Sequence, residues 1–255
     1  MNALESEANA VVADLEDAVA PGEKDAAREV VTRVFAQVAS TGPLRVVRVN
    51  GVGTPFHGDD LAAVAAIAPD AVVLPKATPE AVDSLGSEGP PVIAIVESAQ
   101  GVRLAYEIGT RPRVAALQIG AVDLGAEVGL EPRPDGLELV YVRSKVVLDA
   151  VAAGLRPPFD VVHLDLDADD ALAAECRLAR SLGLRGKACI HPDQVPIVNR
   201  AFAPTEAEVA WARRVLAADE EAAAQARGAF ALDGAMVDLP VVERARRVLA
   251  ETERS

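Results

Sequence analysis

The chain has 255 residues, of which 51% are hydrophobic and 25% charged, a composition typical of a globular protein and not of a disordered one. The formal net charge is −14 and no basic run occurs, which argues against binding to nucleic acid or to an anionic membrane. No signal peptide and no apolar run near the roughly 20 residues of a membrane span is seen. Cys176 and Cys189 lack a CxxC spacing, so we expect a reduced, cytoplasmic protein.

Short β-branched runs alternate with alanine-rich helical stretches over most of the chain, a pattern typical of repeated β/α units. In chain order, the predicted strands are residues 11–15, 45–49, 71–75, 92–97, 114–120, 161–165 and 187–190. The predicted helices between them are residues 23–39, 59–67, 99–108, 137–153 and 169–182. No GxGxxG follows a strand and no P-loop occurs, so Rossmann and P-loop folds are disfavoured.

Each predicted strand ends on, or is followed by, polar or charged side chains. These are Asp14, Glu16, Asp17, Arg48, Asn50, Lys76, Glu97, Asp123, Asp165 and His191. A TIM (β/α)8 barrel builds its site in this way, at the C-terminal ends of its strands. The alternative is that strand ends are polar simply because they meet solvent. Only seven strands are predicted, so we expect a TIM-type barrel that lacks its first strand, which should precede residue 11.

The alternation changes near residue 202. We therefore expect a barrel domain at residues 1–202 and a C-terminal helical extension at residues 203–255. Thr205 and Glu208, three residues apart, predict a capping box at the start of a helix over 205–226. A short apolar run, an Asp-Gly turn and a last helix follow.

Arg48 lies in the apolar strand sequence RVVRVN, residues 45–50. Continuous valines predict a strand buried on both faces, where an unpaired guanidinium would cost much free energy. Arg48 therefore needs an acidic partner, such as Glu16 or Asp17 on the adjacent strand, or an anionic ligand, such as a carboxylate or an enolate. Both can hold, because a guanidinium carries five donors.

Glu97 and Asp123 end consecutive predicted strands, so a barrel would bring their carboxylates together. A hard divalent cation relieves the repulsion between two such groups, and Mg²⁺ typically binds one or two protein carboxylates with waters and substrate oxygens. Only three histidines occur, so any metal must rely largely on oxygen ligands. The alternative is that each carboxylate pairs with a surface lysine or arginine.

Seven motifs of the chain, in order, resemble the HpcH/HpaI aldolase and citrate lyase β-subunit family, and most of all its free-standing citrate lyase β-like proteins, which act on 3-hydroxyacyl-CoA thioesters. The motifs are DLEDAVAPGEKDAAR (14–28), RVN (48–50), LPK (74–76), ESAQGV (97–102), IGAVDLGAEVG (119–129), GKACIHPDQV (186–195) and DGAMVDLPVVERARRVL (233–249).

The resemblance implies a carbon–carbon lyase on a TIM barrel that depends on Mg²⁺, with Mn²⁺ as an alternative. It implies that Glu97 and Asp123 hold the metal and that Arg48 binds the keto acid. It further implies that Asp238 acts as acid or base in a neighbouring subunit of a homo-oligomer, a trimer or hexamer. The extension would then serve as a lid or oligomerisation segment. The substrates would be a keto acid and a malyl- or citramalyl-type CoA thioester.

Alternatives remain open: a pyruvate-dependent aldolase for hydroxy-keto acids, a subunit of a citrate lyase complex, or a paralogue without turnover. Glu16 is a candidate for substrate binding, because it could position Arg48 or a metal-bound water. The alternative is that Glu16 pairs with Lys24 or Arg28 as part of the packing. Lys76 is a candidate for contact with an anionic substrate. His191 is expected to cap the helix after it, and Cys189 is expected in the core.

Overall fold

The computed structural model describes residues 3–38, 42–225 and 227–252. The chain forms two compact units, Met1–Ala201 and Phe202–Ser255, each described by itself below. This boundary lies one residue before the one predicted from sequence. Among the described residues, no helix is both long and apolar enough to cross a membrane.

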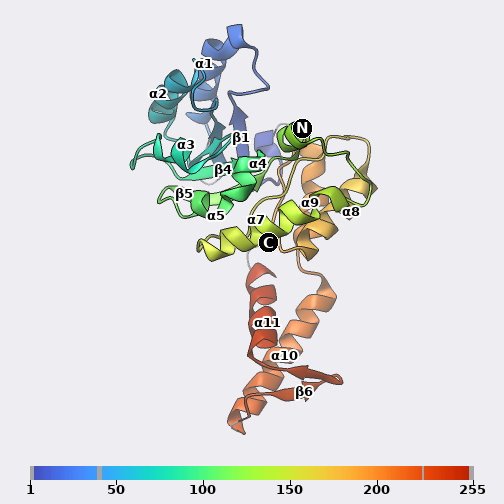
Figure 1. The fold of residues 1–255 in the computed structure, drawn as a ribbon. Helices are drawn as coiled ribbons and strands as arrows, with labels where there is room; N and C mark the ends of the chain where they lie inside the picture. The colour runs from blue at the N-terminus through green and yellow to red at the C-terminus, as the bar shows by residue number, and fades with distance from the viewer. Residues whose placement is uncertain (1–2, 39–41, 226, 253–255) are drawn as a thin grey trace. The chain divides into compact units, whose positions relative to one another are not determined.

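The first unit is built on a sheet of five parallel strands (Figure 1). The strands are β1 (Ala10–Asp14), β2 (Leu44–Arg48), β3 (Ala71–Leu74), β4 (Val92–Val96) and β5 (Val114–Ile119), and they lie across the sheet in that order. β3 is buried at every position and β4 at nearly every one, as their continuous apolar runs predict for strands of a parallel sheet. The five strands confirm the first five predicted from sequence, within one or two residues at each end.

Helices connect the strands and cover the sheet. The α-helices of this part are α1 (Lys24–Phe35), α2 (His57–Ile67), α3 (Pro79–Asp83), α4 (Ala99–Arg103), α5 (Ala105–Gly109), α6 (Ala121–Val128), α7 (Val140–Ala152), α8 (Asp169–Ser181) and α9 (Val195–Phe202). Short 3-10 turns lie at η1 (Ala3–Glu5), η2 (Pro21–Glu23), η3 (Leu137–Leu139) and η4 (Pro192–Gln194). α1 packs against α2, and α5 and α7 pack against each other and against β5 (Figure 1).

The predicted helices are present, with three differences. The predicted helix 137–153 is η3 followed by α7. The predicted helix 23–39 is the last residue of η2 followed by α1, which ends at Phe35, four residues before the predicted end; residue 39 lies outside the described residues. The predicted helix 99–108 is divided into α4 and α5 at Leu104, whose backbone leaves the helical region at φ −101° and ψ 17°.

The predicted strands 161–165 and 187–190 are wrong. Among the described residues, the sheet continues past β5 only by two isolated parallel bridges, Gln118 with Phe159 and Asp160 with Lys187. Pro157 and Pro158 come immediately before Phe159, and since proline has no amide hydrogen they cannot extend the ladder in that direction.

Asp160, directly before the predicted strand 161–165, belongs to a buried cluster of charged side chains. The Asp160 carboxylate is fully buried and accepts from Arg143 Nε at 2.8 Å and from Lys187 Nζ at 3.0 Å. Beyond it the chain turns toward solvent, and Leu164 is 64% exposed. The apolar residues of the segment VVHLD, residues 161–165, therefore do not form a core strand. Closure of a barrel does not appear in the described ladder, where β1 pairs with β2 alone.

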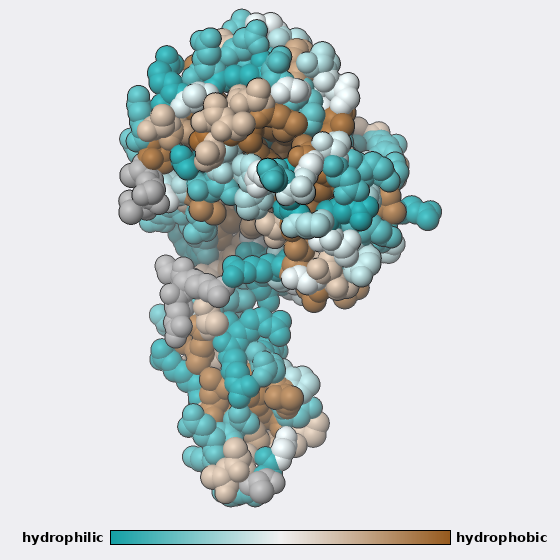
Figure 2. Space-filling view, turned by 90° about the vertical axis from the view of Figure 1, so that its left-hand side faces the viewer, coloured by the Kyte–Doolittle hydropathy of each residue, from teal (hydrophilic) through white to brown (hydrophobic). Residues whose placement is uncertain are grey.

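The second unit consists of α10 (Glu206–Ala224), a hairpin of β6 (Phe230–Leu232) and β7 (Ala235–Val237), and α11 (Leu239–Thr252). α10 and α11 lie side by side (Figure 1) and bury a small apolar core between them; Figure 2 shows hydrophobic residues flanked by hydrophilic ones along this unit.

Local signals in the sequence of the second unit hold in the structure. The predicted capping box is present, with Glu208 N donating to Thr205 Oγ1 at 3.2 Å and Thr205 N donating to Glu208 Oε2 at 2.8 Å. The predicted turn is also present, with Asp233 and Gly234 both at positive φ, as a two-residue hairpin requires. Residue 226, the predicted end of the first helix, lies outside the described residues.

Candidate active site

The carboxyl ends of β1 to β4 and the start of α6 bring the predicted site residues of the first unit together. The parallel strands all end at one edge of the sheet, so residues directly after them become neighbours although 20 to 35 positions separate them. The residues at this edge are Asp14, Glu16, Arg48, Lys76, Glu97 and Asp123. Asp17 is exposed beside them and acts on Glu16 through its charge.

Arg48 is held by two carboxylates. Its Nε and Nη2 donate to Asp14 Oδ1 and Oδ2 at 2.7 and 2.6 Å, and its Nη1 lies 2.8 Å from Glu16 Oε2. The sequence predicted Glu16 or Asp17 as the partner of Arg48, so Glu16 is confirmed, but Asp14 was not predicted as a partner. The register of the first two strands could have identified Asp14, because Asp14 and Arg48 are paired positions of β1 and β2.

The two carboxylates on Arg48 differ in their acidity. Burial works to raise the pKa of Asp14, but hydrogen bonds from Arg48 and from backbone amides outweigh it and lower that pKa. Burial raises the pKa of Glu16 to about 7 against the lowering effect of Arg48, and the charges of Asp17 and Glu97 add to the rise. Glu16 is thus an acid whose proton is available near neutral pH.

Glu97 sits in a space left by a glycine. It is buried at the end of β4, and its Oε1 accepts from the backbone N–H of Lys76 at 2.6 Å. A Cβ on Gly120 would lie 2.5 Å from both Cβ and Oε2 of Glu97, so only glycine allows this placement. Burial raises the pKa of Glu97 to about 6, against the lowering effect of the Lys76 amide, and the charge of Asp123 adds to the rise.

Lys76 contacts both carboxylates that were predicted to hold a metal. Besides its amide bond to Glu97, its Nζ lies 3.4 Å from Asp123 Oδ1. Its backbone is left-handed, with φ +49°, which is uncommon for a residue with a Cβ. Asp123 therefore has the lysine partner that the sequence left open, and this partner is more than half exposed.

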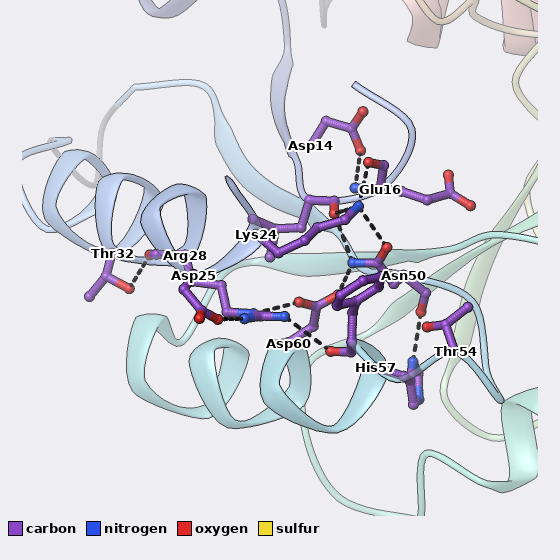
Figure 3. Close-up of polar contacts among 12 residues, drawn as sticks. Asp14, Glu16, Lys24, Asp25, Arg28, Thr32, Asn50, Thr54, His57 and Asp60 are labelled. Atoms are coloured by element: carbon purple, nitrogen blue, oxygen red, sulfur yellow. Dashed lines mark hydrogen bonds and ion pairs between the residues drawn. The ribbon is translucent and has the colours of Figure 1, made fainter. Parts of the chain in front are cut away.

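A buried polar network next to this edge binds the backbone of the segment after β1 (Figure 3). Lys24 Nζ donates to the carbonyl oxygens of Leu15 and Glu16, each at 2.7 Å, and to Asn50 Oδ1 at 2.8 Å. Asn50 Nδ2 donates in turn to Asp60 Oδ2 at 2.6 Å, and Arg28 Nε donates to Asp60 Oδ1 at 2.8 Å. All three donors of the ammonium are used. Lys24 thus binds the backbone of Glu16 and not its carboxylate, which leaves that carboxylate for Arg48.

A cleft of about 720 Å³ opens beside these residues. Its walls come from the loops after β1, β2 and β3, and they include Glu16, Asp17, Asn50, Thr54, Lys76 and Thr78. The cleft carries both acidic and basic groups and has room for part of an extended ligand.

The remaining predicted residues are Asp238, His191 and Cys189. Asp238 is half-buried in the second unit, directly after β7, and its carbonyl oxygen accepts from the amides at the start of α11. His191 is the N-cap of η4, and its Nδ1 accepts from Asp193 N at 3.3 Å, which confirms its predicted capping role. Cys189 is partly exposed and lies outside any strand, so its predicted place in the core is wrong.

The architecture defines a class: a parallel α/β protein with acidic and basic side chains gathered at the carboxyl edge of its sheet. Comparison with known families gives the narrower answer. The model of the family described as HpcH/HpaI aldolase/citrate lyase matches residues 1–192, and the chain belongs to this family. The resemblance inferred from the seven motifs is thereby confirmed, as is the prediction of an enzyme of the metal-dependent, citrate lyase β-like kind.

Similar proteins and structures extend the match into the second unit. Citrate lyase subunit beta of Leuconostoc mesenteroides subsp. cremoris is 37% identical over 257 residues, covering 95% of this chain and 85% of that protein. A (3S)-malyl-CoA thioesterase of Cereibacter sphaeroides is 38% identical over 250 residues, covering 96% and 87%. The crystal structure of CitE from Mycobacterium tuberculosis in complex with magnesium, acetoacetate and coenzyme A has a TM-score of 0.82 at 38% identity, covering 96% and 90%.

Proposed function

We propose that this protein is a Mg²⁺-dependent lyase that cleaves a malyl- or citramalyl-type 3-hydroxyacyl-CoA thioester into a keto acid and an acyl-CoA, or joins them in reverse. The observation that carries the proposal is the grouping of Glu97 and Asp123 with a doubly held Arg48 at one sheet edge, beside a cleft of about 720 Å³. The names of the relatives, a citrate lyase subunit and a malyl-CoA thioesterase, support a substrate of this class.

The residues at this edge fit a magnesium ion. Glu97 and Asp123 would hold it, and they offer only carboxylate oxygens, which are the ligands Mg²⁺ prefers. The raised pKa of Glu97 reflects burial beside a second negative charge, a situation that a divalent cation relieves. In the described part of the chain no group of three or more His, Cys, Asp or Glu side chains is placed so that it could hold a metal ion, so waters and substrate would complete the coordination. When bound, the metal would supply Lewis-acid polarisation of the keto acid oxygen.

Arg48 is suited to bind the carboxylate of the keto acid. Three of its five N–H groups are used by Asp14 and Glu16, which leaves two for a ligand. Its side chain is 24% exposed, so it has been partly desolvated without being sealed off. A preorganised guanidinium in such a setting stabilises a developing negative charge more strongly than water does.

The reaction requires two proton transfers. In the cleavage direction the hydroxyl proton passes to a general base, the carbinol oxygen becomes a carbonyl, and the bond to the thioester α-carbon breaks. The electron pair of that bond becomes an enolate, which must gain a proton. We propose that this proton is donated by Asp238 of another copy in a homo-oligomer, a trimer or hexamer. The second unit would serve as lid or oligomerisation segment of this cytoplasmic enzyme.

A panel of thioesters tests the proposal. Malyl-, citramalyl- and 3-hydroxy-3-methylglutaryl-CoA should be incubated with the protein and Mg²⁺, with EDTA as control, and the products separated by chromatography. The lyase is supported by metal-dependent release of a keto acid together with an acyl-CoA. Release of free CoA with an intact hydroxy acid would instead indicate a thioesterase. A hydroxy-keto acid is incubated separately without CoA, and its cleavage would indicate an aldolase.

We propose in addition that the five-stranded sheet forms part of a TIM-type barrel wall. The parallel order of its strands and the two bridges beyond β5 support this. A C-terminal strand edge that carries the site is the arrangement in which such barrels place their catalytic groups.

A further inference from the structure

Lys76 stands in a position that the lyase chemistry proposed above does not use. It is the residue after Pro75, which follows β3, and it touches each of the two carboxylates assigned to the metal. Its amide N–H binds Glu97 Oε1 at 2.6 Å, and its ammonium lies 3.4 Å from Asp123 Oδ1. The left-handed backbone at φ +49° costs free energy for a residue with a Cβ, and such strain concentrates at functional sites.

The two contacts of Lys76 differ in what they do to a cation. The amide bond orients Glu97 and carries no net charge, so it is compatible with a metal on the same carboxylate. The ammonium places a full positive charge on Asp123. A divalent cation on Asp123 would lie within a few ångströms of that charge and repel it, so the ammonium and the cation compete for the same carboxylate.

The ammonium has an alternative position. Lys76 is 59% exposed along its side chain and is also a lining residue of the cleft, so its long stem can turn away from Asp123 without breaking any buried contact. An anion entering the cleft would offer it a partner of the same charge as Asp123. Resting on the proposed metal site, we infer that Lys76 exchanges partners: it neutralises Asp123 until the cation binds, and its ammonium then moves to the anionic substrate.

The inference is tested by binding and not by turnover. Lys76→Asn removes the ammonium while keeping the amide N–H, and asparagine tolerates the left-handed conformation better than most residues. Lys145→Gln is the matched control, since it also removes one positive charge, from a lysine paired with Asp149 on α7. Isothermal calorimetry measures Mg²⁺ binding to each chain, and then pyruvate binding at saturating Mg²⁺.

We expect Lys76→Asn to bind Mg²⁺ about two- to fivefold more tightly than the unmodified chain and to bind pyruvate more weakly, since a half-exposed ion pair contributes a few tenths to one kcal/mol. Lys145→Gln should change neither. Equal or weaker Mg²⁺ affinity in Lys76→Asn would overturn the exchange, as would unchanged pyruvate affinity. If none of the chains binds Mg²⁺, the proposed metal site itself is wrong and the exchange falls with it.

Discussion

Gly120 allows a direct test of how Glu97 is placed. In Gly120→Ala the new Cβ would lie 2.5 Å from Glu97 Cβ, 2.5 Å from Glu97 Oε2 and 2.9 Å from the Ile95 side chain. Ordinary contacts between such atoms are about 3.5–4.0 Å, so Glu97 must move by roughly 1 Å. Neither the Glu97 Cβ nor the Ile95 side chain can move aside freely, because Ile95 is buried in β4 and Glu97 is buried directly after that strand.

The structure sets the size of the effect. Overpacking of a filled core costs about 1–3 kcal/mol of unfolding free energy, which at roughly 2–4 °C per kcal/mol lowers Tm by several degrees. Gly125→Ala is the matched control in the neighbouring helix α6, because its Cβ would meet nothing closer than Leu130 at 3.8 Å. There alanine should instead stabilise the protein by about 0.5–1 kcal/mol, because it lowers the entropy of the unfolded chain.

Thermal melts and Mg²⁺ calorimetry on the two variants provide the assay. We expect Gly120→Ala to melt lower and to bind Mg²⁺ more weakly, because the displaced carboxylate no longer meets the geometry that magnesium requires. Gly125→Ala should melt at or above the unmodified chain with unchanged metal affinity. The steric reasoning would be refuted if Gly120→Ala melted as high as Gly125→Ala and bound the metal equally well.

Three further predictions follow from the proposed roles. Glu97→Gln should weaken Mg²⁺ binding by about tenfold or more in calorimetry with a keto acid present, and equal affinity would remove Glu97 from the metal site. Asp238→Asn should lower turnover by about 10²-fold with substrate affinity nearly unchanged, and mixing it with Arg48→Ala chains should restore some activity in hybrid oligomers; no recovery in verified hybrids would argue for a role within one chain. Because the pKa of Glu16 is raised from 4.5 to about 7, the folded state holds a proton that the unfolded state releases, so the free energy of unfolding should fall as pH rises from about 4.5 to 7. Urea denaturation in EDTA should therefore show a flatter pH profile of this free energy for Glu16→Gln than for the unmodified chain. An equally steep profile would contradict the assignment.

Local patterns in the sequence were enough for the β/α alternation, the polar strand ends, the capping box at Thr205 and the hairpin turn at Asp233 and Gly234. Each depends on residues close together in the chain, whose backbone preferences and hydrogen bonds act whatever the rest of the fold does. The same patterns failed at residues 161–165, because apolar letters do not reveal that the neighbouring Asp160 is tied to Arg143 and Lys187 in a buried charge cluster.

The partners of the charged residues at the site were decided only by tertiary structure. Arg48 could have paired with Glu16, Asp17 or a ligand on sequence grounds, and the register of β1 and β2 selected Asp14 together with Glu16. Lys24 took backbone carbonyls instead of a carboxylate. The physical reason is that a strand pattern predicts which residues end at the sheet edge, whereas the pairing of charges there depends on distances of a few ångströms between segments 20 to 35 residues apart.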